Sequence, residues 1–287
     1  PPGKLYEELF KLMFPGTPYA HPVLGTKESV SGIDRDDFMQ YLADFYVPDN
    51  MSAVVVGDVD AGDVVDEFRS LTEGWEPRPA VKEDLADFSP EDRPGIQGFT
   101  LEKDVNMSYV MMAFQTDGYT DERENATLDV VSSIMGEGRS SRLYRRFVEE
   151  EQLASSVQAF IYPLKKAGLF VIFAAMDPDS VEPFRAGVIE EIERLKSGRV
   201  TSTELEKVKT MLKADFTFSN ETDSNIARTI GHFHTLGQLE HALGYYETID
   251  SITPSDIHTH VGETLDPQQY TIGIINPRIT NTVGGAR

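Results

Sequence analysis

The chain has 287 residues, of which 40% are hydrophobic, enough for one large core or two ordinary ones. Its 48 acidic residues outnumber 26 basic ones and give a net charge of −22, a field that repels nucleic-acid phosphates. No apolar run approaches the ~20 residues of a membrane-spanning helix, and the lack of cysteine excludes disulfides and thiolate zinc sites. The acidity fits either a solubilising surface or a face that attracts basic ligands, and composition leaves both interpretations open.

The first 75 residues predict elements in the order α-α-β-α. Apolar side chains at helical spacing predict three helices, over residues 4–13, 34–45 and 58–71. The almost wholly apolar run 52–57 predicts a short strand of the kind buried at the centre of a sheet.

Residues 76–96 interleave prolines with acidic side chains, which predicts an exposed linker between domains. A second unit is expected over residues 97–280, followed by a tail at 281–287. Its strands are predicted over 98–103, 107–114, 155–162, 168–175 and 270–275. Its helices are predicted over 120–135, 139–151, 179–196, 201–218, 224–241 and 245–249, with one more capped by Thr253.

The order of elements over residues 33–56 repeats over residues 252–274. We therefore expect an α+β fold of two related units, each a mainly antiparallel sheet packed against helices, with the first unit truncated at its N-terminus. The chain opens on Pro1-Pro2-Gly3 without Met, so we expect it to be cut from a longer polypeptide.

Several phrases occur in order along the whole chain and carry a family resemblance. They include Phe14-Pro15-Gly16-Thr17-Pro18, Tyr46-Val47-Pro48-Asp49-Asn50 and Gly138-Arg139-Ser140-Ser141-Arg142-Leu143-Tyr144. By these phrases the chain resembles the insulinase family of zinc peptidases, which includes pitrilysin and the mitochondrial processing peptidase, and in particular the C-terminal portion with its inactive domain. The resemblance implies α+β domains that enclose a chamber.

The resemblance also implies a zinc site built on the inverted motif H-x-x-E-H, with a second glutamate downstream. This motif is absent from the sequence, and in the family it lies upstream of the point where this chain starts. His232, His234 and His241 are candidates for a metal cluster. Residues two positions apart on a helix point in different directions, however, so a shared ligand role for His232 and His234 is disfavoured. Glu7 and Glu8 lie too near the following turn to match the zinc glutamate. We expect no metal ligand here, and zinc only in the full-length parent or its partner.

Active members of the family carry an arginine and, seven residues later, a tyrosine that hold substrate and stabilise the oxyanion. Alignment on Ser141-Arg142-Leu143 puts Val148 and Ser155 at these two positions, and neither side chain replaces the missing donor. No catalytic residue is therefore predicted in this chain. Arg142 and Tyr144 are the candidate substrate-binding residues.

Two hypotheses of function follow from the resemblance. The first is the C-terminal portion of a zinc-dependent metallopeptidase subunit, which shapes a peptide-holding chamber and is inactive on its own. The alternative is a non-catalytic scaffold or substrate-binding partner subunit of the same family. An H-x-x-E-H motif upstream would favour the first.

The expected partners are the same under both hypotheses. They are an extended peptide or unfolded polypeptide and a homo- or heterodimer with a family subunit, without nucleic acid or a membrane span. Peptide is expected to add as a strand to a sheet edge, with the hairpin over 162–175 and the strand over 107–114 as candidate edges.

Overall fold

The computed structural model describes residues 2–81, 94–119, 122–198 and 200–278. The contacts divide the chain into two units: unit 1 takes residues 1–21, 89–213 and 245–287, and unit 2 takes residues 22–88 and 214–244. Most of the predicted linker 76–96, and all of the predicted tail 281–287, lie outside the described residues.

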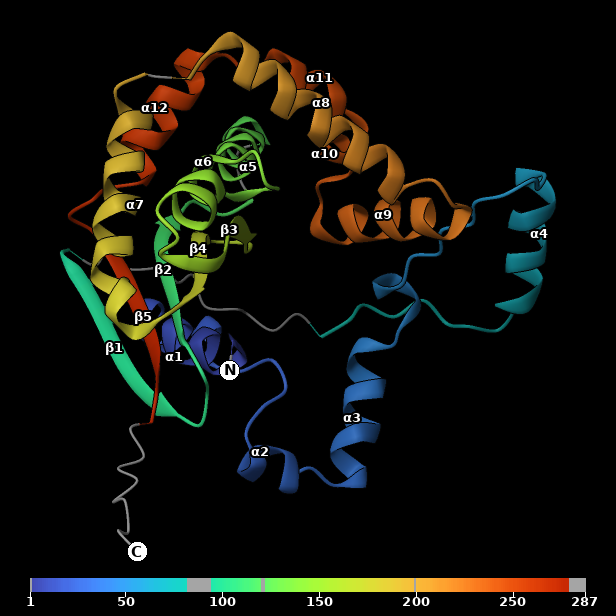
Figure 1. Ribbon diagram of the computed structural model, residues 1–287. Helices are drawn as coiled ribbons and strands as arrows, with labels where there is room; N and C mark the ends of the chain where they lie inside the picture. The colour runs from blue at the N-terminus through green and yellow to red at the C-terminus, as the bar shows by residue number, and fades with distance from the viewer. Residues whose placement is uncertain (1, 82–93, 120–121, 199, 279–287) are drawn as a thin grey trace, which may run out of the picture. The chain divides into compact units, whose positions relative to one another are not determined.

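Unit 1 is built on one five-stranded sheet, which bears out the α+β prediction (Figure 1). Its strands run in the order β1-β5-β2-β4-β3, and all neighbours are antiparallel except β1 and β5. All five strands were predicted. Their bounds are β1 Ile96–Lys103, β2 Ser108–Thr116, β3 Ala154–Pro163, β4 Gly168–Met176 and β5 Tyr270–Pro277.

One face of this sheet is packed by helix α1 (Pro2–Met13), which the sequence predicted. Leu5 and Leu9 on α1 are fully buried, in one cluster with Met111 of β2 and Val171 of β4. The other face is packed by helices that include α5 (Glu122–Gly136), whose last residue lies directly against β3. The sheet is thus buried on both sides, which explains the nearly continuous apolar sequence of β2 and β4.

The remaining helices of unit 1 follow the predicted order with one difference. Instead of a single helix over 139–151, the structure has a short helix that passes into a π-helix. Their bounds are α6 Arg142–Tyr144, the π-helix Arg145–Glu150, α7 Val181–Lys196, α11 Tyr245–Ser251 and α12 Pro254–Thr264, while α8 (Ser202–Ser219) runs from unit 1 into unit 2. Among the described helices, none has the length and apolar character that crossing a membrane requires.

Unit 2 contains the α-helices between α1 and the predicted linker, and a later helical pair. Its further helices are α2 Lys27–Ser31, α3 Arg35–Phe45, α4 Ala61–Leu71, α9 Asp223–Leu236 and α10 Leu239–Leu243. The prediction of one helix over 224–241 was wrong, because Gly237 adopts a left-handed φ of 70° and ends α9. Glycine takes this conformation without steric cost, which makes it the common residue after a helix end.

The predicted buried strand over 52–57 was also wrong. These residues form no strand, and Val55 keeps 55% of its surface exposed. A strand is stabilised by hydrogen bonds to a neighbouring strand, and the described residues of unit 2 offer none. Val54 lies instead near Gly231 of α9. The apolar run has high β propensity, but a strand forms only where a second strand can pair with it, and a short stretch of sequence does not show whether that second strand is present.

Candidate functional site

The last three residues of the phrase Gly138–Tyr144, which include the predicted substrate-binding residues, form α6. Arg142 points to α8, where its Nε and Nη2 donate to the two carboxylate oxygens of Glu204 at 2.8 and 2.7 Å. This two-point contact ties α6 to α8, with only 16% of the Arg142 side chain exposed. Tyr144 lies half-buried at the end of α6. The structure thus gives Arg142 a carboxylate partner within the chain, which sequence reasoning did not foresee.

A charged cluster surrounds Arg146 on the adjacent π-helix. Its guanidinium donates to Glu151, Glu190 and Glu191 at 2.7, 2.7 and 3.0 Å. Burial lowers the pKa of Arg146, but these hydrogen bonds raise it further than burial lowers it. Arg146 therefore stays charged, and its ion pairs with Glu190 and Glu191 hold the π-helix against α7.

Val148 and Ser155, which we expect from the family phrase to stand at the arginine and tyrosine positions, lie on two backbone irregularities. Val148 is half-buried within the π-helix, and exposed Ser155 sits where the register between β3 and β4 shifts by one residue. Between them, Gln152 has a φ of 52°, which non-glycine residues seldom adopt. π-Helices and β-bulges often re-aim side chains next to functional sites. Here the Ser155 hydroxyl donates to the backbone oxygen of Ala175 at 3.0 Å.

The residues considered as metal ligands do not form a zinc site. Within the described ranges, no group of three or more His, Cys, Asp or Glu side chains could hold a metal ion. His232 and His234 lie on α9, two residues apart. Glu8 on α1 accepts hydrogen bonds from Lys4 and Lys11, and Glu7 pairs with Lys4 as well. The described side chains therefore do not fit the zinc ion that the resemblance implies.

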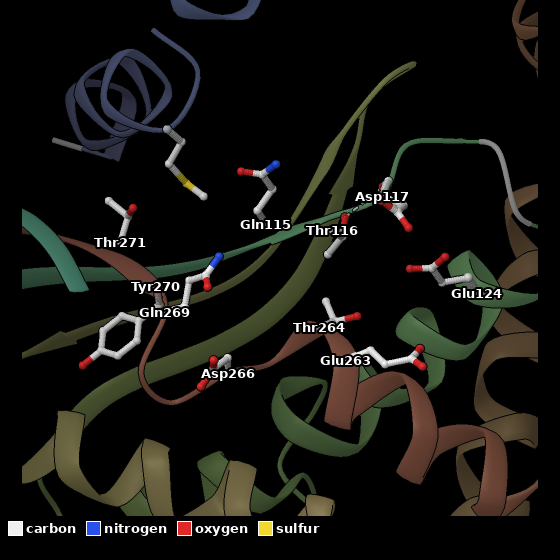
Figure 2. Close-up of a pocket in the computed structure, with 11 residues that line it drawn as sticks. Gln115, Thr116, Asp117, Glu124, Glu263, Thr264, Asp266, Gln269, Tyr270 and Thr271 are labelled. Carbon is white, nitrogen blue, oxygen red and sulfur yellow. Dashed lines mark hydrogen bonds between the residues drawn. The ribbon is translucent and has the colours of Figure 1, made fainter. Parts of the chain in front are cut away.

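An acidic cavity of about 270 Å³ lies in unit 1, at the end where β2 extends past the beginning of β5 (Figure 2). The side chains that line it come from α1, β2, α5, α12 and β5 and from the loops that follow β2 and α12. They are Met13, Gln115, Thr116, Asp117, Glu124, Glu263, Thr264, Asp266, Gln269, Tyr270 and Thr271. Four of them are carboxylates, and none of the lining residues is Lys or Arg.

Two of the cavity's lining side chains are held in place by hydrogen bonds. The Tyr270 hydroxyl accepts from Nε of Arg185 at 2.6 Å, and Asp266 accepts from the backbone N–H of Gln268 at 2.8 Å. Thr271 also lines the cavity, with only 4% of its surface exposed. Sequence reasoning missed this cavity, since its carboxylates come from two distant segments, 117–124 and 263–266, and no local pattern links the two.

Comparison with known proteins places these features in a family context. A family model described as the peptidase M16 inactive domain matches residues 32–212. The chain is 26% identical over 282 residues to an uncharacterized zinc protease of Rickettsia bellii, covering 96% of this chain and 66% of that protein. It is 25% identical over 286 residues to the zinc protease PqqE of Helicobacter pylori, with 96% and 63% covered.

More distant relatives include a probable mitochondrial-processing peptidase subunit beta of Arabidopsis thaliana, 22% identical over 281 residues, with 94% of this chain and 52% of the relative covered. The chain thus spans between about half and two-thirds of the length of these curated relatives.

Solved structures share the fold. A protease from Helicobacter pylori superposes with a TM-score of 0.87 at 24% identity, over 96% of this chain and 67% of that one. A peptidase M16 inactive domain from Pseudomonas fluorescens superposes with a TM-score of 0.80 at 18% identity, over 96% of this chain and 65% of that one. A chain of complex III2 from Candida albicans superposes with a TM-score of 0.79 at 18% identity, over 96% of this chain and 66% of that one.

Proposed function

The chain belongs to the M16 peptidase family, where it matches the inactive domain, and from this premise we propose that it holds extended peptide for a zinc peptidase whose metal ligands lie outside these 287 residues. The zinc-protease names of its relatives support the parent activity, and the missing H-x-x-E-H motif supports a holding role for this part. Arg142 and Tyr144 remain the proposed substrate contacts of the α6 segment.

The observation that carries the proposal is the free edge of β3. Strand β3 is the last strand of the sheet and pairs with β4 alone among the described strands, so its other edge can accept a peptide strand. Ser155, Ser156 and Gln158 along it are exposed. The hairpin candidate over 162–175 contains part of this strand. The other candidate edge, 107–114, was wrong, because β2 lies between β5 and β4.

Aromatic side chains beside the β3 edge give an extended peptide apolar contacts. Phe10 and Tyr162 meet edge to face with ring centres 5.3 Å apart, and Tyr6 lies 6.5 Å from Phe160. Tyr162 is 40% exposed, so part of this cluster is open to a ligand. Aromatic rings provide large contact areas at small loss of side-chain entropy.

Hydrogen exchange of the full chain with an unfolded, fluorescently labelled peptide tests this proposal. Slower exchange is expected at the β3 amides between residues 155 and 162, with matching binding by anisotropy. A second peptide with N-methyl groups at alternate residues cannot donate to the strand, so it should bind at least tenfold more weakly. Equal binding of both peptides, or protection elsewhere alone, would contradict strand addition at β3.

A scaffold role is the second candidate function, favoured by the shared fold with a chain of complex III2. Under either role we propose association with a second family subunit, because relatives include both an alpha-1 and a beta subunit of mitochondrial-processing peptidase. Light scattering of the chain alone and mixed with an M16 subunit measures this association. If the chain assembles with the subunit but added peptide slows hydrogen exchange at no β3 amide, the scaffold role is favoured.

A further inference from the structure

The two faces of the sheet beside edge strand β3 differ in what they offer to a bound peptide. We propose that β3 selects polypeptide segments in which large apolar side chains alternate with small ones. Every second side chain would then pack on an aromatic patch, formed by Tyr6, Phe10, Phe160 and Tyr162. This inference rests on the proposed function, because it requires that peptide adds to β3 as a strand.

Strand β3 carries little of the protection that is common on an exposed sheet edge. Its 10 residues contain no charged side chain, although 26% of the whole chain is charged, and its only proline, Pro163, is the last residue. The strand at the opposite edge, β1, ends instead with Glu102 and Lys103. Native proteins place charges on edge strands to keep other chains from pairing with them, so the uncharged β3 is suited to pairing. In a chain of net charge −22, this uncharged strip also matches an uncharged, apolar partner better than a charged one.

The side chains of β3 alternate between the two faces of the sheet. Phe160 and Tyr162 lie on the face that α1 covers, since both rings contact aromatic side chains of α1. Val157 and Ala159 lie on the opposite face, where they are buried and where α5 ends against Ala159. A peptide strand beside β3 continues the sheet, so its own side chains point in turn to the α1 face and to the α5 face.

The α1 face offers apolar contacts next to this edge. The ring centre of Tyr6 lies 6.2 Å from that of Tyr162 and 6.5 Å from that of Phe160, and Phe10 lies 5.3 Å from Tyr162. Tyr162 is 40% exposed, and the other three rings are partly exposed. Neighbouring side chains on one face of adjacent strands contact each other, and pairs of aromatic side chains are among the stabilising ones. A large apolar side chain of the peptide on this face would therefore bury the exposed part of the patch.

The α5 face leaves less room for a side chain. A Cβ atom added at Gly136, the last residue of α5, would lie 2.1 Å from the backbone N of Ala159, so the helix end touches the backbone of β3. Gly138, two residues further on, takes a left-handed φ of 71° as the chain leaves the helix. A peptide side chain that points to this face near Ala159 meets the end of α5, and a small side chain is accommodated there more easily than a large one.

Together the two faces favour an alternating pattern rather than a composition. In an alternating peptide all large side chains lie on one face, and a shift of one residue moves all of them to the other face. One of these two registers therefore places every large side chain on the α1 face. A peptide with the same residues in two blocks has no such register, because part of its large side chains always points to α5.

Two labelled peptides of equal composition test the pattern with the full chain. Both contain phenylalanine and serine in equal numbers between the same soluble flanks. In one peptide the two residue types alternate, and in the other the phenylalanines are consecutive. By anisotropy we expect the alternating peptide to bind about tenfold more tightly, with slower hydrogen exchange at the β3 amides. Equal affinity, with β3 protected by both peptides, would overturn the pattern but agree with strand addition. Protection of β3 by neither peptide would contradict the proposed function as well.

Variants assign the preference to the aromatic patch. Tyr162→Ser removes the most exposed ring and should reduce the preference for the alternating peptide to about twofold. The blocked peptide should still slow exchange at β3 in this variant, which shows that the sheet is intact. The matched control is Tyr246→Ser in α11, which removes a tyrosine of similar exposure, 37% against 40%, and should bind as the wild type does.

Three results would overturn the proposal. The preference could be lost in both tyrosine variants, or it could persist in both, and either result would mean that the patch does not select the peptide. Exchange at β3 could also slow with rising protein concentration in the absence of peptide. This last result would mean that a second copy of the chain occupies the edge.

Discussion

Arg142 and Glu204, which lie 62 residues apart in the sequence, form a two-point ion pair with N–O distances of 2.8 and 2.7 Å. The sequence Thr201-Ser202-Thr203-Glu204 has the pattern of a capping box, in which the Glu204 side chain would accept from the backbone N–H of Thr201. The structure keeps half of this box, since the backbone N–H of Glu204 donates to the Thr201 hydroxyl at 3.1 Å. The Glu204 carboxylate reaches across to α6 instead, so it holds two helices together.

This pair should contribute measurably to folding. Arg142→Ala and Glu204→Ala each remove one partner and leave the other charge largely buried, so each should lower the free energy of unfolding by ~1–3 kcal/mol. Because both variants break the same contact, the double variant should cost less than the sum. Urea unfolding of the four proteins measures the coupling, and a coupling energy near zero would contradict the role of the pair. If Arg142→Ala lowers the affinity for peptide and Glu204→Ala does not, this result would support the proposed contact of Arg142 with substrate.

Gly136 should be irreplaceable at the contact between α5 and β3. A Cβ atom added there would lie 2.1 Å from the backbone N of Ala159, so α5 would have to move away from the sheet. Gly136→Ala should therefore lower the free energy of unfolding by ~3 kcal/mol or more. The control is Gly262→Ala in α12, where no atom lies within 4 Å and the change should be neutral or stabilising by ~0.5–1 kcal/mol. Thermal unfolding compares the two, and similar shifts in Tm would refute the close approach.

Much of the fold could be predicted because its determinants are local. The apolar stripe of α1 and the capping box of Thr253 with Asp256 specify helices through neighbours three or four residues away. The wrong prediction at 52–57 concerned a strand, which depends on a distant partner. The missed break at Gly237 had a visible signal, since glycine is a common residue after a helix end, but the apolar periodicity on both sides outweighed it.

The candidate sites were less predictable for the same reason. The positions Val148 and Ser155 came from the family phrase, but no sequence pattern indicated the π-helix or the β-bulge that carry them. The acidic cavity gathers Asp117 from the loop after β2, Glu263 from α12 and Thr271 from β5. The net charge of −22 was known from the sequence, but where carboxylates converge depends on sheet order and register.

The stability of unit 1 should depend on pH through Asp129 in α5. Burial, and then the charge of Glu137, raises the pKa of Asp129 from its ordinary 3.8 to about 7. The folded chain keeps a proton that the unfolded chain loses near pH 4, so the contribution of Asp129 is full below that pH and is lost as pH rises to about 7. Asp129→Asn should therefore raise the free energy of unfolding by up to ~4 kcal/mol at pH 8 and change it little near pH 4. Chemical unfolding across this range measures the difference, and a difference independent of pH would contradict the raised pKa.

The 287-residue chain should bind no stoichiometric zinc and cleave no peptide. Its sequence lacks H-x-x-E-H, and we expect from the family phrase that Val148 and Ser155 occupy the positions of the family's arginine and tyrosine donors. Val148→Arg with Ser155→Tyr restores those donors but supplies no ligand for the metal, so this variant should also be inactive when assayed alone. Elemental analysis after dialysis against zinc, and a fluorogenic peptide panel with and without chelator, measure both expectations. Cleavage that a chelator abolishes, in either protein, would mean that this part of the family carries a metal site of its own.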